Sequence, residues 1–241
     1  MYLIQITDLH IGFENEDTNG VDVRNNFIRT LNAISKEQVD ALIITGDLCY
    51  RQPEKEIYKW IKIQLDAINV PYYLISGNHD NAIWMCEIFG LNDQTNEELF
   101  YHKKFENWDA LFLDTSPAIM SDQQYHWFEK ELNKLDSNAI IFMHHPPIKM
   151  EVPFMDSKHC FKQQKKFQDL LSNYPFAFEI FCGHYHVDKS NRLQNLNVTV
   201  VPSLYIQIKD DQENYEVDHY RIGYNKIQLE SDVLISEIIY L

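Results

Sequence analysis

With 241 residues, of which 45% are hydrophobic and 24% charged, the chain has the composition of an ordinary globular protein with a substantial buried core. Its formal net charge of -15 argues against binding to long nucleic acids, because that binding depends on lysine and arginine. No stretch approaches the roughly 18 consecutive apolar residues of a membrane span, and the N-terminus lacks the basic segment of a secretory signal. No repeat or linker stands out, so residues 1–241 are expected to form a single domain.

Seven nearly continuous apolar runs predict strands that are buried on both faces, as in a sheet covered by helices. In chain order these runs are residues 2–6, 41–44, 72–75, 110–113, 139–142, 178–181 and 198–201.

Helical patterns lie between the predicted strands. Apolar side chains recur at turn spacing over residues 23–34, and Pro53 begins a second segment of this kind, since proline suits the first turn of a helix. Ser121 and Gln124 form the pattern of a capping box at the start of a third helix. A fourth helix is expected around residues 161–171.

The C-terminal part of the chain has a different pattern. Residues 219–224, 227–229 and 233–240 predict strands, with a tight turn near Asn225 and Lys226. This all-β ending indicates a second sheet that packs against the first.

Five short polar blocks each follow directly on a predicted strand. They are Asp8-Leu9-His10, Gly46-Asp47, Gly77-Asn78-His79-Asp80, His144-His145 and Gly183-His184-Tyr185-His186. Each block alone is a common sequence, and a histidine after a strand is more often a hydrogen-bonded structural residue than a ligand. However, the blocks contain six of the ten histidines. Because ligands bind at the carboxyl ends of strands in an α/β sheet, the combination predicts a metal site assembled from all five.

The order of these blocks resembles that of the calcineurin-like metallophosphoesterases. The segments Met-His-His-Pro-Pro at residues 143–147 and Phe-Cys-Gly-His-Tyr-His at residues 181–186 are most similar to class III cyclic-nucleotide phosphodiesterases and the related glycerophosphodiesterases. The resemblance extends from Asp8 to His186. It implies an α/β fold in which two mixed sheets, flanked by helices, form a four-layer α/β/β/α sandwich.

The same resemblance implies a site for two metal ions. The first ion would be held by Asp8, His10, Asp47 and His186, and the second by Asp47 as a bridge with Asn78, His144 and His184. Carboxylate, imidazole and amide donors suit Mn, Fe or Zn, and the lack of thiolates leaves no preference for a soft metal. A hydroxide formed on the two ions would then attack phosphorus.

His79 is implied to be an outer histidine that contacts the phosphate and protonates the leaving group. Asp80 either orients His79 or caps the helix that follows. His145 supports His144, contacts the substrate or packs beneath the prolines, whereas Tyr185 is expected to point away from the metals.

Three long connections remain, at residues 81–109, 146–158 and 203–216. Loops beside strand ends usually carry substrate selectivity. Phe154 and Met155 are therefore candidates to contact an apolar part of the substrate. Tyr50, which follows the Gly46-Asp47 block, is another candidate, although an aromatic residue after a strand usually packs. The other histidines, namely His102, His126, His159 and His219, are expected to be surface or structural residues.

The predicted function is metal-dependent hydrolysis of a small phosphodiester, with 3′,5′-cyclic AMP the first candidate. Glycerophosphodiesters, other nucleotides and phosphomonoesters are alternatives, because one fold supports several substrates. A non-catalytic scaffold is disfavoured because all seven implied ligands are present. The expected partner is a small phosphodiester or nucleotide rather than a membrane or long nucleic acid, and a homodimer remains open.

The pattern of cysteines indicates the cellular compartment. Cys49, Cys86, Cys160 and Cys182 are scattered without a C-x-x-C pair, a usage typical of reduced thiols rather than a disulfide framework. We therefore expect a cytoplasmic protein.

Overall fold

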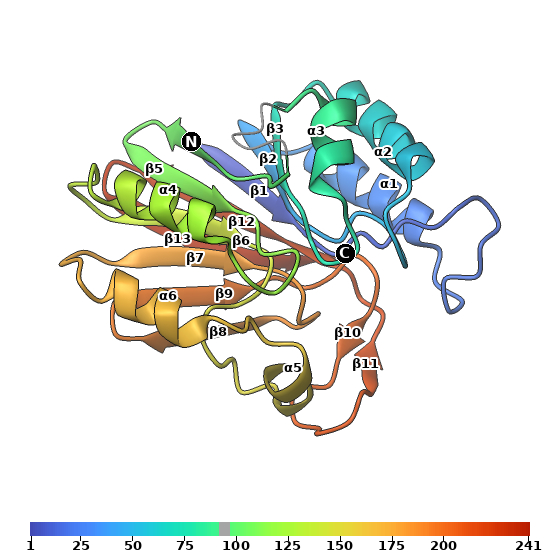
Figure 1. Cartoon of the computed structure of the whole chain (residues 1–241). Coiled ribbons are helices and arrows are strands. Elements are labelled where there is room, and N and C mark those ends of the chain that lie inside the picture. Colours follow the sequence, from blue (N-terminus) through green and yellow to red (C-terminus); the bar gives the residue numbers. More distant parts are fainter. Residues whose placement is uncertain (92–96) are drawn as a thin grey trace.

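The computed structural model describes residues 1–91 and 97–241, and most of its strands belong to two large sheets (Figure 1). Part of the predicted connection 81–109, residues 92–96, lies outside the described residues.

The first sheet has the strand order β13-β12-β1-β2-β3. Its strands are β1 (Tyr2–Ile6), β2 (Ala41–Thr45), β3 (Tyr72–Ile75), β12 (Gly223–Glu230) and β13 (Val233–Tyr240). Strands β1, β2 and β3 are parallel, whereas β12 runs antiparallel to β1 and β13 antiparallel to β12. The three parallel strands therefore end at the same edge of the sheet.

The second sheet has the order β4-β5-β6-β7-β9-β8. Its strands are β4 (Tyr101–Phe105), β5 (Trp108–Leu113), β6 (Ala139–Met143), β7 (Phe178–Cys182), β8 (Lys189–Leu193) and β9 (Leu196–Val200). The central strands β5, β6, β7 and β9 are parallel, and β4 and β8 run antiparallel at the two edges. A separate hairpin pairs β10 (Gln207–Ile208) with β11 (Val217–His219).

Helices cover the outer face of each sheet (Figure 1). The first sheet carries α1 (Val23–Ile34), α2 (Lys55–Ala67) and α3 (Ala82–Phe89), and the second carries α4 (Asp122–Leu132) and α6 (Gln164–Leu171). The short helix α5 (Pro153–Lys158) lies instead beside the β10–β11 hairpin.

Apolar side chains fill the space between the two sheets. Leu3 and Ile43 of the first sheet share one buried cluster with Phe112, Phe142 and Phe181 of the second. The rings of Phe112 and Phe142 stack with centroids 5.0 Å apart. Burial on both faces explains the continuous apolar runs of these strands. The predicted four-layer α/β/β/α sandwich is thereby confirmed.

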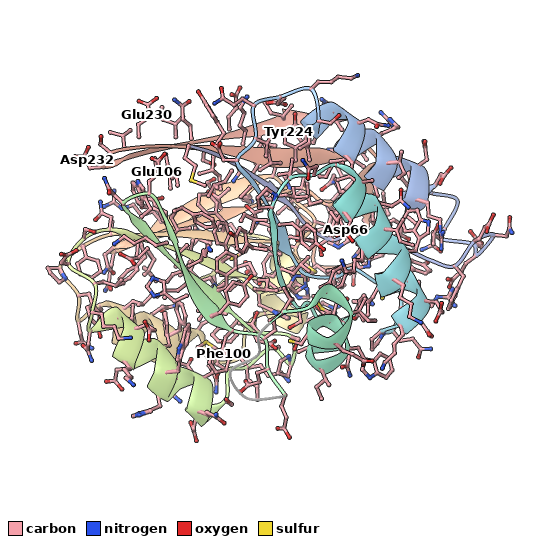
Figure 2. All side chains as sticks on the ribbon, turned by 90° about the horizontal axis from the view of Figure 1, so that it is seen from above. Asp66, Phe100, Glu106, Tyr224, Glu230 and Asp232 are labelled. Atoms are coloured by element: carbon pink, nitrogen blue, oxygen red, sulfur yellow. The ribbon has the colours of Figure 1, made fainter. Side chains whose placement is uncertain are left out.

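The amino ends of the parallel strands lie at the end of the sandwich remote from the ligand blocks. In Figure 2, Glu230 and Asp232 at the β12–β13 turn lie near Glu106 at the β4–β5 turn, and the N-terminal ammonium group lies 3.6 Å from the Glu106 carboxylate. Charged turns occupy this end, so the crevice for a ligand is at the carboxyl ends of the strands.

One predicted turn is wrong. Strand β12 runs without a break through Asn225 and Lys226, and the chain reverses only after Glu230. Asn225 is fully buried and donates a hydrogen bond to Gln5 on the adjacent strand β1. A pairing between distant strands thus satisfies the polar side chain that, read locally, indicated a turn.

The edges of the second sheet, β4 and β8, were not predicted. Both are rich in polar residues and largely exposed, because an edge strand outside the two-sided core needs no continuous apolar run. The connection at 81–109 contains α3, a helix implied only by the capping alternative for Asp80, and the connection at 146–158 contains α5, which was not predicted. Within the described residues, no helix is long and apolar enough to cross a membrane.

Candidate metal centre

The five polar blocks meet where strands of both sheets end. The first three follow β1, β2 and β3 of the first sheet, and the last two follow β6 and β7 of the second. Their ligand atoms form three groups, within each of which all atoms lie within 4.8 Å of one another. The groups are Asp8 with His10 and His186, Asp47 with His144 and His184, and His10 with Asp47 and His79.

Asp47 lies at the centre of this arrangement. Its Oδ2 is 3.7 Å from Nε2 of His10, 3.4 Å from Nε2 of His144 and 3.9 Å from Nε2 of His79. Its Oδ1 accepts a hydrogen bond of 2.9 Å from the backbone N–H of His79. One carboxylate oxygen therefore faces donors from both sides of the site, as a bridging ligand requires.

Asp8 presents one oxygen to the site and uses the other for support. Oδ2 accepts hydrogen bonds from the Thr7 hydroxyl, at 2.8 Å, and from the backbone N–H of His184, at 2.9 Å. The buried Oδ1 has no hydrogen-bond partner among the described residues and lies 3.2 Å from Nε2 of His186. Buried carboxylate oxygens are rarely left unsatisfied, so this atom fits a cation ligand.

Backbone carbonyls fix the tautomers of three histidines. Nδ1 of His144, Nε2 of His184 and Nδ1 of His186 each lie within hydrogen-bond distance of a carbonyl, at 2.7, 2.9 and 3.0 Å. The carbonyls belong, in that order, to Thr45, His159 and Ile206. A carbonyl only accepts hydrogen bonds, so each of these nitrogens carries the proton. In the neutral form of each ring, the other nitrogen has a lone pair for a metal.

Burial and neighbouring charges shift the pKa values of several side chains in the site. Burial lowers the pKa of His10 to about 4 and, together with His144, that of His184 to about 3, so both rings are neutral at pH 7. Burial opposes the charged forms of Asp8 and Asp47, but facing imidazoles outweigh it and hold both pKa values below their usual range. Burial likewise disfavours a charged His144, yet Asp47 raises the His144 pKa to about 9. The pair of buried carboxylates thus favours positive charge close to it.

The backbone at the site is conformationally unusual. Asp8, His10, Asp47, His184 and His186 all have positive φ, with values between 45° and 69°. Such values are uncommon for residues other than glycine and cluster at functional sites, because the surrounding fold must hold them. The chain turns sharply at each strand end, and this directs the side chains inward.

A glycine lets two of these turns approach each other. Gly46 has φ of 97°, and a Cβ atom there would lie 2.6 Å from the backbone nitrogen of Gly77 and 2.7 Å from Nδ1 of His144. Only glycine fits, because both neighbouring atoms are held by the site itself.

The third block contributes Asn78 and His79. Oδ1 of Asn78 lies 3.2 Å from Nε2 of His144, on the side of the second implied ion. Nδ1 of His79 donates a hydrogen bond of 2.9 Å to the carbonyl of Arg51. His79 is therefore oriented by a carbonyl of the loop after β2, and its Nε2 faces the site.

Asp80 turns away from His79. Its carboxylate accepts hydrogen bonds from the backbone N–H groups of Leu48, at 3.1 Å, and Gly77, at 3.0 Å, and from the Tyr58 hydroxyl, at 3.1 Å. The cap of helix α3 is the next residue, Asn81. Burial and the charge of Asp47 raise the pKa of Asp80 to about 6. The observed contacts tie the loop that carries Asp47 to the loop that carries Asn78.

His145 and Tyr185 are buried beside the implied ligands. His145 lies next to Thr115, its ring centroid 4.0 Å from that of His184, so it packs against an implied ligand. Tyr185 is fully buried and donates a hydrogen bond of 3.0 Å to Asp156, which confirms that it points away from the site.

A cavity of about 430 Å³ opens next to these side chains. The predicted residues Tyr50, Phe154 and Met155 line it, together with the site residues His10, Asp47, Asn78, His79, His184 and His186. Residues that the sequence reasoning missed also line it, namely Asn19, Arg51, His159, Tyr205, Ile206, Ile208 and Tyr215. Four of these, residues 205, 206, 208 and 215, lie in the predicted connection 203–216, but no local pattern identified them.

The fold and the site together define a class of protein. Residues 1–188 match the calcineurin-like phosphoesterase family. The chain therefore belongs to the calcineurin-like phosphoesterases, and it is a metal-dependent phosphoesterase whose fold implies a dinuclear divalent metal centre.

Individual relatives show which phosphoesterases the chain is similar to. The chain is 34% identical over 205 residues to a probable cyclic nucleotide phosphodiesterase of Fibrobacter succinogenes, a match that covers 85% of this chain and 80% of that protein. It is 30% identical over 198 residues to a probable glycerophosphodiester phosphodiesterase of Arcobacter nitrofigilis, covering 77% and 72%. A dimetal phosphatase from Danio rerio has the same fold, with a TM-score of 0.74, 12% identity and coverage of 100% and 98%.

Proposed function

We propose that the protein hydrolyses small phosphodiesters, with 3′,5′-cyclic nucleotides, cyclic AMP first among them, as its substrates. The observation that carries the proposal is the convergence of two buried carboxylates and four imidazoles. One of the carboxylate oxygens, Oδ1 of Asp8, has no hydrogen-bond partner among the described residues. The relative with 34% identity supports a cyclic nucleotide.

In this proposal seven side chains hold two divalent ions. Asp8, His10, Asp47 and His186 bind the first, and Asp47, Asn78, His144 and His184 bind the second. None of the seven is a thiolate, so Mn, Fe and Zn all suit the donor set. When bound, the two ions would polarise the phosphodiester and lower the pKa of the attacking water to roughly 7.

His79 would bind the phosphate and donate a proton from Nε2 to the leaving oxygen. Its Nδ1 is held by the Arg51 carbonyl, so Nε2 faces the cavity without further adjustment. Asp80 would act as a positioning residue, because its hydrogen bonds to Leu48 and Gly77 set the distance between the loops that carry Asp47 and His79.

A glycerophosphodiester is the second candidate substrate. The relative with 30% identity favours it, since that protein is described as a probable glycerophosphodiester phosphodiesterase. The metal site serves both substrates equally, so the side chains that line the rest of the cavity decide between them.

Metal removal tests the reaction. Dialysis against a chelator should abolish hydrolysis of bis(p-nitrophenyl) phosphate, and Mn²⁺ should restore it. Activity that is indifferent to removal of metal, verified by elemental analysis, would refute the proposed chemistry.

A substrate panel tests the choice of substrate. We expect kcat/KM for cyclic AMP to exceed kcat/KM for glycerophosphodiesters and phosphomonoesters. A higher value for a glycerophosphodiester would transfer the assignment to the second candidate and leave the metal chemistry intact.

We also propose that residues 1–241 act as one domain in the cytoplasm. Two strands beyond the segment matched by the family complete the first sheet: β12 pairs with β1, and β13 pairs with β12. The described residues contain no disulfide, and three of the four cysteines are buried, which suits a reducing compartment.

A further inference from the structure

Aromatic rings line the cavity together with the implied metal-binding side chains. Phe154 of α5 and Tyr215 of the loop between β10 and β11 meet edge to face, with ring centroids 5.9 Å apart. Tyr50 and Tyr205 form a similar pair at 5.7 Å, and all four residues line the cavity. Tyr215 is 52% exposed, so its ring is not part of the core.

The Phe154–Tyr215 pair is attached to the metal centre by backbone hydrogen bonds. The N–H of Phe154 donates to the carbonyl of Gln212, at 3.1 Å, which joins α5 to the hairpin loop. At the base of the hairpin, the N–H of Ile208 donates to the carbonyl of His186, at 2.9 Å. The ring of His186 in turn donates to the carbonyl of Ile206, at 3.0 Å. The hairpin, which lies beside α5 (Figure 1), therefore holds the aromatic pair at a set position relative to His186.

The charges around the cavity suit an anion with a flat apolar part. Asp47 is the one acid among the described residues that line it, although the whole chain carries a net charge of -15. Arg51 lies at the mouth, its guanidinium 5.2 Å from the Tyr50 ring, and the Lys158 ammonium lies 4.9 Å from the Phe154 ring. A nucleotide has both features, since its phosphate is anionic and its base is planar.

We infer that Phe154 and Tyr215 form a base-binding subsite, in which the nucleobase of a cyclic nucleotide packs against the two rings while its phosphate lies at the metal centre. The inference rests on the proposed phosphodiesterase function and adds the residues that recognise the substrate. Packing on aromatic rings tolerates every base, because each base has a π face. Adenine and guanine nucleotides should therefore be accepted with similar kcat/KM.

A glycerol group would not use this subsite. It has no planar face, so it would gain little from contact with the rings of Phe154 and Tyr215. Large apolar groups at the rim of a polar site usually mark binding. The aromatic pair thus favours the nucleotide over the glycerophosphodiester.

Two substrates that differ only in the base provide the test. Cyclic AMP is compared with the 3′,5′-cyclic phosphate of methyl riboside, which has the same diester and no base. We expect the metal-loaded protein to prefer cyclic AMP by on the order of 10-fold in kcat/KM. Tyr215→Leu and Phe154→Leu should each reduce this preference through a higher KM for cyclic AMP, with kinetics on the base-free diester unchanged.

Tyr220→Leu is the matched control, because Tyr220 is 61% exposed and does not line the cavity. It should leave both substrates unaffected. An equal loss on both substrates in the Phe154 and Tyr215 variants, or no loss on either, would overturn the subsite.

Binding of adenosine separates failure of the subsite from failure of the proposed function. In saturation-transfer NMR with metal-loaded protein, the base protons of adenosine should receive magnetisation, and Tyr215→Leu should remove the effect. If this holds while no cyclic nucleotide is hydrolysed, the subsite stands and the proposed substrate is wrong. If cyclic AMP is hydrolysed but both variants bind adenosine as the unsubstituted protein does, the subsite is wrong and the phosphodiesterase function stands.

Discussion

The metal centre and the aromatic rim of the same cavity are built in opposite ways. The implied metal ligands come from five short blocks, each fixed to the end of a buried strand and several held in left-handed backbone conformations. The rim comes from two connections, α5 and the β10–β11 hairpin, which belong to neither sheet. Phe154 and Tyr215 meet there, where a backbone hydrogen bond from Phe154 to Gln212 joins the two connections.

This difference explains how one framework can support several substrates. The ligand positions are tied to the two sheets, so a change in them disturbs the core. The rim is attached to the two sheets at a few points. Its residues can therefore change without affecting the chemistry at the metal centre, as expected of loops at strand ends. Variants in each region should therefore lose different properties.

The largest effect is expected at the bridging ligand. Asp47→Ala removes the carboxylate that faces both halves of the site, so both ions should be lost and hydrolysis should fall by well over 100-fold, since even outer partners of ligands cost about 10–100-fold. Elemental analysis and hydrolysis of bis(p-nitrophenyl) phosphate measure this. Asp66→Ala, on the exposed surface of α2 (Figure 2), is the control and should retain metal and activity. Full metal content in Asp47→Ala would contradict a bridging role.

The next effect is expected at His79. His79→Ala should keep its metal content but lower kcat by about 10²-fold or more for poor leaving groups, because proton transfer to the leaving oxygen is lost. The loss should be smaller for p-nitrophenyl esters, whose leaving group needs no proton. His126→Ala, on the exposed face of α4, is the control. Loss of metal from His79→Ala would reassign the residue as a ligand.

A glycine tests whether the close approach of the loops is required. Gly46→Ala and Gly90→Ala both introduce a side chain at positive φ, but only the Cβ at position 46 would collide with other atoms. We expect Gly46→Ala to lower metal content and activity by about 10-fold or more, by analogy with other supports of metal ligands. Gly90→Ala should lower the melting temperature alone. Equal metal content in the two variants would show that the loops adapt.

The smallest effect is expected far from both regions, at Glu37. Its carboxylate accepts hydrogen bonds from Tyr224 and Lys226 of β12, the latter at 2.5 Å (Figure 2 labels Tyr224). Although burial opposes its charge, these partners hold the pKa of Glu37 below its ordinary value of 4.5. A depressed pKa stabilises the fold above pH 4.5, and the contribution is lost as the pH falls through the lower, folded-state value.

Glu37→Gln should therefore lower the free energy of unfolding by about 1 kcal/mol at pH 7 and by less near pH 3. Denaturant titrations of both proteins at the two pH values measure the difference, and hydrolysis at pH 7 should not change. A difference that is equal at both pH values would exclude the ion pair as its source.

Much of the framework could be predicted because buried parallel strands have a local signature. The runs that became β1, β2, β3, β6 and β7 are almost entirely apolar, and the residues after them provided the implied ligands. Strands β4 and β8 have no such signature, since they lie at exposed edges. The sequence around Asn225 predicts a turn, because the hydrogen-bond partner of Asn225, Gln5, is far away in the sequence.

The site likewise has features that the sequence predicts and features that it does not. The identities of the seven implied ligands are written in the sequence because a metal needs particular donor atoms at the ends of particular strands. The sequence could not indicate that the Arg51 carbonyl orients His79, since any residue supplies a carbonyl. It also could not place His159, expected at the surface or in a structural role, on the wall of the cavity.

The sequence by itself determined the buried strands that precede the polar blocks, the donor residues at their ends and the family to which the chain belongs, because periodicity and side-chain chemistry are local properties. Only the tertiary structure decided which nitrogen of each histidine faces the metals, which loops Asp80 joins and which aromatic rings share the cavity. These features depend on contacts between segments that are distant along the chain, and such contacts exist only once both sheets have packed together.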